Sequence, residues 1–138
     1  MKKLFKSFIT LFVRLRYPVS LPEEVAAALG MERRRRFCSF KGFLEELEGC
    51  EPKNLYRLMA RESAEAVFHA AVRKERFNGT SLFSFYLGET WVEFRLLFDE
   101  ESCLRRIYLC HCHTSDEEGV EISLLDKMEY DRHLLAVH

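Results

Sequence analysis

The chain has 138 residues, 48% hydrophobic and 31% charged, a balance typical of one folded domain with its own core. Three Pro and six Gly exclude a low-complexity or linker-rich chain. Residues 1–41 hold ten Lys and Arg but three Asp and Glu, whereas the rest holds eleven and nineteen, so a basic third precedes an acidic body. The basic third could meet phosphate, lipid headgroups, a protein, or the acidic body of the same or another copy.

Five cysteines occur at irregular spacing, at positions 38, 50, 103, 110 and 112. An odd number without a secretory signal favours reduced thiols over a disulfide framework. The expected location is therefore cytoplasmic.

Met1–Arg16 projects as an amphipathic helix. Its apolar arc consists of Leu4, Phe5, Phe8, Ile9, Leu11, Phe12, Val13 and Leu15, and its polar arc of Lys3, Lys6, Ser7, Thr10 and Arg14. The segment is too short and too charged to cross a bilayer. We expect it to pack on the sheet or on a second subunit, with a membrane-surface helix and a targeting peptide as alternatives.

A second helix is predicted over Glu23–Leu29, ended by Gly30. Residues Glu24–Met31 resemble the first half of a helix-turn-helix motif. The basic residues that follow are Arg33, Arg34, Arg35 and Arg36. The second half of the motif does not match, because Arg36 and Ser39 stand where a recognition helix buries apolar side chains. The four arginines either contact nucleic-acid phosphates and bases or form a solvated edge beside nearby glutamates.

Two further helices are predicted before the strands. Phe40–Leu47 has apolar residues at three-to-four spacing and is closed by Gly49. Residues 52–78 are rich in Leu and Ala and predict one long helix, ended by Asn78-Gly79. Its apolar residues lie on more than one side, which predicts a helix placed between the sheet and the basic helical layer of residues 1–50.

Residues 80–125 predict an antiparallel sheet. Aromatic and β-branched runs separated by polar or Gly-bearing breaks are Thr80–Leu87, Thr90–Phe98, Leu104–His113 and Gly119–Leu125. Alternation gives one apolar face, expected to be core, which includes Phe83, Phe85, Val92, Phe94, Leu96, Phe98, Ile107 and Leu109. The candidate partner-binding residues on the other face are Tyr86, Trp91, Arg95, Arg106 and Tyr108, because aromatic and Arg side chains dominate interface energetics. The N-terminal helix or another subunit could cover the same face instead.

Cys110-His111-Cys112-His113 is the one cluster with metal-ligand chemistry. On a strand, either same-face pair could supply two ligands but not four. We therefore expect no metal and no cofactor. Residues 126–138 form a C-terminal element, either a last strand or a short helix.

Together these patterns predict a single α+β domain over residues 1–138. An N-terminal helical layer and one long helix pack on a four- to five-stranded antiparallel meander. The favoured function is a non-enzymatic protein-interaction module, a small cytosolic adaptor, chaperone or regulator that self-associates as a homodimer. The alternatives are a nucleic-acid-binding regulator that uses Arg33–Arg36, and a small-molecule-binding or enzymatic pocket between the sheet and the long helix.

Overall fold

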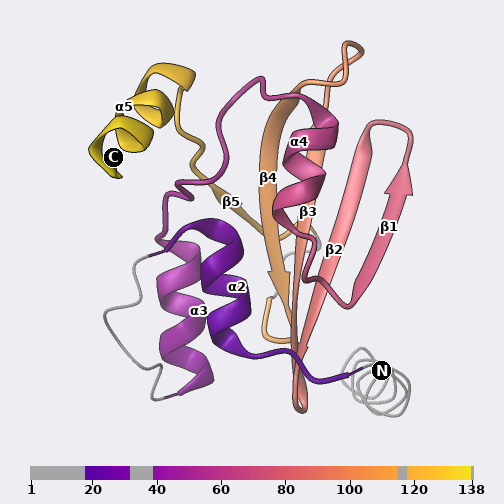
Figure 1. Ribbon diagram of the computed structural model, residues 1–138. Helices are drawn as coiled ribbons and strands as arrows, with labels where there is room; N and C mark the ends of the chain where they lie inside the picture. The colour runs from indigo at the N-terminus through magenta and orange to yellow at the C-terminus, as the bar shows by residue number, and fades with distance from the viewer. Residues whose placement is uncertain (1–17, 32–38, 115–117, 138) are drawn as a thin grey trace.

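A five-stranded antiparallel sheet carries the fold, and its strand order follows the chain (Figure 1). The computed structural model describes residues 18–31, 39–114 and 118–137. The strands are β1 (Arg73–Phe77), β2 (Thr80–Leu87), β3 (Thr90–Phe98), β4 (Leu104–His111) and β5 (Val120–Ile122), and each pairs with its neighbours in sequence. The α+β class with an antiparallel meander is therefore confirmed.

Two-residue turns join the first three strands and set their register. Phe77 pairs with Thr80 across Asn78-Gly79, and Leu87 pairs with Thr90 across Gly88-Glu89. Gly79 has φ 77° and Gly88 has φ 73°. Such left-handed backbone favours glycine, because a Cβ is strained there.

Three helices lie on one face of the sheet, which we call the inner face (Figure 1). They are α2 (Pro22–Leu29), α3 (Phe40–Glu48) and α4 (Arg61–Val67). Gly30 ends α2 with φ 70°, as its sequence predicts. The C-terminal element is a helix, α5 (Lys127–Val137), and it stands apart from the sheet. The ring of Tyr130 in α5 lies 4.6 Å from the ring of Tyr56.

The core fills the space between these three helices and the inner face. The ring of Phe68, which follows α4, stacks on Phe83 at 4.9 Å and lies 5.2 Å from Phe94. The fully buried large side chains are Phe43, Phe68, Phe85, Phe94, Leu29, Leu47, Leu55, Leu96, Leu104, Ile107, Leu109 and Ile122. The strand residues expected in the core are all buried, because alternation placed them on the face that the helices cover.

The predicted long helix over residues 52–78 is wrong. An irregular segment comes first, then the seven-residue α4, and then β1. Leu58 has φ 72°, which no helix accommodates, and its N–H donates to the carbonyl of Leu104 at 2.7 Å. Asn78-Gly79 is the turn of the β1–β2 hairpin rather than a helix end. Of the apolar residues predicted on several sides of this helix, Ala66 lies in α4, Met59 lies before it, and Phe68, Ala70 and Val72 lie in the connection to β1.

The N-terminal helical layer is not confirmed as a unit. Its described parts are the short helices α2 and α3, and residues 1–17 and 32–38 lie outside the described residues. Across the described ranges, no helix has the length and apolar character needed to span a membrane.

Candidate functional site

The five predicted partner-binding residues share the sheet face opposite the helices, which we call the outer face. Tyr86 pairs with Trp91 between β2 and β3, and Arg95 pairs with Tyr108 between β3 and β4. Arg106 lies two positions from Tyr108 on β4, so it projects to the same side. The helices α2, α3 and α4 all lie on the other side (Figure 1).

One half of the outer face is held by contacts among its own side chains. The guanidinium carbon of Arg95 lies 5.1 Å from the centre of the Tyr108 ring, a cation–π distance. Arg95 Nη2 donates to the carbonyl of Glu118 at 2.9 Å, and Arg106 Nη1 donates to Tyr108 Oη at 3.3 Å. Arg106 Nε also lies 3.9 Å from Glu121 Oε1. We call Arg95, Arg106 and Tyr108 the arginine half; its groups are held in place before any partner binds.

The other half is partly shielded from solvent: Ser84 and Tyr86 are buried, and Trp91 and Glu93 are half-buried. Ser84 is 4% exposed and Tyr86 is 7% exposed, although both point away from the helices. The indole Nε1 of Trp91 has less than 1 Å² of accessible surface, and no group of the described residues forms a hydrogen bond with it. Burial raises the pKa of Glu93, and the hydrogen bond that its carboxylate accepts from Ser84 Oγ at 3.3 Å offsets part of that rise. We call Ser84, Tyr86, Trp91 and Glu93 the tryptophan half.

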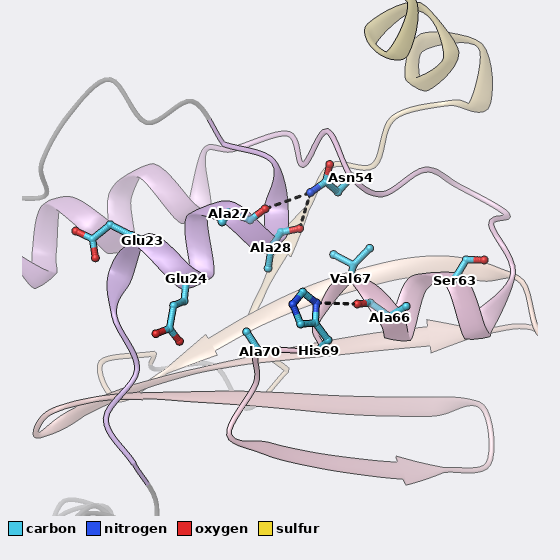
Figure 2. Close-up of a pocket in the computed structure, with 10 residues that line it drawn as sticks. All are labelled: Glu23, Glu24, Ala27, Ala28, Asn54, Ser63, Ala66, Val67, His69 and Ala70. Atoms are coloured by element: carbon cyan, nitrogen blue, oxygen red, sulfur yellow. Dashed lines mark hydrogen bonds between the residues drawn. The ribbon is translucent and has the colours of Figure 1, made fainter. Parts of the chain in front are cut away.

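A separate cleft of about 560 Å³ opens between α2 and α4 (Figure 2). It is lined by Glu23, Glu24, Ala27, Ala28, Asn54, Ser63, Ala66, Val67, His69 and Ala70. Asn54 Nδ2 donates to the carbonyls of Ala27 and Ala28, at 3.2 and 2.9 Å, at the end of α2. His69 Nδ1 lies 3.2 Å from the carbonyl of Ala66. Asn54 and His69 thus bond to the backbone of the cleft walls.

The Cys-His run is only partly in the sheet, because β4 ends at His111 and Cys112 and His113 lie in the turn that follows. His111 is 6% exposed on the inner face, and its Nε2 lies 2.9 Å from Glu48 Oε1 on α3. The backbone N–H of His113 donates to His111 Nδ1 at 3.1 Å, which places the ring proton on Nε2, facing Glu48. Cys110 lies on the outer face with its thiol 3.7 Å from the carbonyl of Glu118. Within the described ranges, no three His, Cys, Asp or Glu side chains are grouped to hold a metal ion.

Sequence reasoning missed a buried polar cluster between α4 and the β1–β2 hairpin. Arg61 is 8% exposed, and its Nη2 donates to the carbonyls of Phe77 and Thr80 and to Ser81 Oγ. Ser81 in turn donates to Glu65 Oε2 at 2.6 Å. The spacing of Arg61 and Glu65 on one helix was a readable signal, but the hairpin that they hold was hidden by the predicted long helix.

Two predicted sites lie outside the described residues. They are Arg33–Arg36, the alternative nucleic-acid site, and Met1–Arg16, the alternative membrane-surface segment. Both alternatives stay predictions.

Comparison with family models, curated proteins and solved structures finds no match, so the functional argument rests on this chain's own geometry.

Proposed function

We propose that the protein is a non-enzymatic interaction module, and that it binds another protein chain through the outer face. The observation that carries the proposal is the gathering of Tyr86, Trp91, Arg95, Arg106 and Tyr108 on that face. Aromatic rings and guanidinium groups are enriched among the residues that dominate binding energy, since both combine a large apolar surface with polar edges.

The arginine half supplies the chemistry of recognition. Arg106 is exposed and its nearest carboxylate, on Glu121, is 3.9 Å away, so its charge is available to an acidic group on a partner. The rings and guanidinium groups are already oriented by the contacts between Arg95, Tyr108 and Arg106, which lowers the entropy cost of binding. A partner for this surface would present carboxylates beside an apolar or aromatic patch.

A second copy of the chain meets this description, because its body is acidic and its outer face is aromatic. The proposal therefore includes self-association of the full chain as a homodimer. Sedimentation equilibrium across a hundredfold range of protein concentration measures it directly.

The substitution Arg106→Ala should raise the dimer dissociation constant by about tenfold or more, as expected for a residue at the centre of an interface. Arg105→Ala is the matched control: Arg105 is the adjacent residue, its side chain is similarly exposed, and it pairs with Asp99 at 2.7 Å. Equal dissociation constants for the two variants, or a chain that stays monomeric at every concentration, would refute self-association through this surface.

A further inference from the structure

Some other part of the protein must shield the tryptophan half from solvent. Ser84 and Tyr86 are buried, the indole Nε1 of Trp91 is inaccessible, and burial raises the pKa of Glu93. Yet α2, α3 and α4 all lie on the opposite face, and α5 stands apart from the sheet (Figure 1). A sheet face open to water would not keep a serine and a tyrosine from solvent.

The sequence leaves one segment suited to this cover. Residues 32–38 join α2 to α3, both on the inner face, and residues 115–117 are three polar residues between β4 and β5. The remaining segment is Met1–Arg16, whose arc of eight apolar side chains needs a surface on which to pack.

We infer that Met1–Arg16 docks on the tryptophan half of the outer face of its own chain, leaving the arginine half for the partner. The inference refines the proposed function, because it states which part of the shared face a partner can reach.

Chain continuity supports docking within one chain. The backbone N–H of Ser20 donates to the carbonyl of Tyr86 at 2.6 Å, so the chain leaving Met1–Arg16 is attached to the end of β2, beside the tryptophan half. Sixteen helical residues span about 24 Å at about 1.5 Å per residue. That length matches about seven strand residues at about 3.3 Å each, enough to cross most of the face.

The chemistry also fits. The apolar arc of Met1–Arg16 would meet Tyr86, the Trp91 ring and Leu82, which is half-buried on the same face. The segment carries Lys and Arg but no Asp or Glu, and its polar arc would face solvent while its apolar arc packs on the sheet.

Trp91 is the single tryptophan of the chain, so intrinsic fluorescence reports on this half alone. In the full chain, Phe8→Asp places a charge on the apolar arc, and Thr10→Asp places the same charge on the polar arc. We expect Phe8→Asp to shift Trp91 emission to longer wavelength and to raise its acrylamide quenching constant at least twofold, while Thr10→Asp behaves as wild type. Identical quenching in wild type and Phe8→Asp would overturn the inference.

Two further measurements complete the test should Phe8→Asp fail to fold. Amide hydrogen exchange of the wild-type chain should show residues 4–15 protected at least tenfold relative to an unfolded peptide, and unprotected amides would overturn the inference. Trp91 quenching should not change on dilution, whereas a rise in quenching on dilution would assign the cover to a second copy and refute docking within one chain.

These outcomes are separable from the proposed function. Arg106→Ala weakens the dimer in the proposed function but should leave Trp91 quenching unchanged. If Arg106→Ala does not weaken the dimer, the proposed function is wrong. If Phe8→Asp does not raise Trp91 quenching, the docking of Met1–Arg16 is wrong.

Discussion

Replacement of Arg61 by Met tests whether the buried polar cluster holds α4 to the sheet. The two N–H groups of Arg61 Nη2 are shared among three acceptors: the carbonyl of Phe77 at 2.7 Å, the carbonyl of Thr80 at 3.0 Å and Ser81 Oγ at 3.0 Å. Its Nε lies 3.5 Å from Glu65 Oε2. One side chain thus connects a helix to both strands of the β1–β2 hairpin.

The expected loss is about 3 kcal/mol of unfolding free energy. A hydrogen bond from a charged donor contributes about 1.5–3 kcal/mol net, and removing one partner of a buried ion pair costs about 3–5 kcal/mol. The lower end applies because Glu65 keeps its bond from Ser81 and stays within 3.4 Å of Arg76 Nε. Met retains the length of the side chain over the Phe98 ring, which lies 4.9 Å from the Arg61 guanidinium carbon, so most of the packing is preserved.

Urea unfolding followed by circular dichroism at pH 7 measures this loss. Arg76→Met is the control, because Arg76 is 63% exposed and contacts the same carboxylate; it should cost at most about 1 kcal/mol. A loss below about 1 kcal/mol for Arg61→Met, or equal losses for the two variants, would show that the cluster does not hold the hairpin.

Three further predictions follow from single residues. Because burial raises the pKa of Glu93 in the folded chain, its charge opposes folding at neutral pH, and Glu93→Gln should stabilise the protein at pH 7. That gain should vanish in urea titrations as the pH falls below the unfolded-state pKa of about 4.5, where both states are protonated; a gain independent of pH would contradict it. Burial raises the pKa of Cys50 to about 11, so at pH 8 iodoacetamide should alkylate it about a hundredfold more slowly in the folded than in the denatured chain, as measured by mass spectrometry. Gly119→Ala should cost more than about 3 kcal/mol in urea unfolding, since its Cβ would lie 2.5 Å from the carbonyl oxygen of Leu109, whereas Gly88→Ala, with open space, should cost only about 1 kcal/mol of backbone strain; similar costs would refute the clash.

The sheet was predictable because its signal is local. Val92, Phe94 and Leu96 alternate with polar or half-buried neighbours, and this period of two fixes which side chains share a face. The same parity predicted that Trp91 and Arg95 would share the outer face.

The first strand was not predictable in the same way. β1 is an edge strand, and four of its five side chains are exposed, so no apolar alternation marks it. The residues before β1 have high helix propensity, so the predicted helix runs on through β1. In the structure, tertiary hydrogen bonds such as that from the Leu58 N–H to the Leu104 carbonyl hold residues before α4 in a non-helical conformation. The Asn78-Gly79 pair is a typical hairpin turn, but after a run of helix-forming residues the same pair also fits a helix end.

The sequence pattern also does not predict which side chains of the outer face are buried. Alternation predicts the direction of a side chain but not whether another part of the protein covers it. Alternation therefore gives Tyr86 and Tyr108 the same expected exposure, although Tyr86 is buried and Tyr108 is half-buried.

The two edges of the meander differ in a way that bears on aggregation. β1 ends the sheet with Arg73, Lys74 and Arg76, so two copies that met edge to edge would bring like charges together. At the other edge, β5 has only three residues. Just after it, the carbonyl of Leu125 already accepts a hydrogen bond from the Arg57 N–H at 2.8 Å, so it cannot pair with an added strand. Neither edge is suited to recruiting a foreign strand into a growing fibril. In the proposed dimer, contact through a face of the sheet closes as a pair instead of propagating.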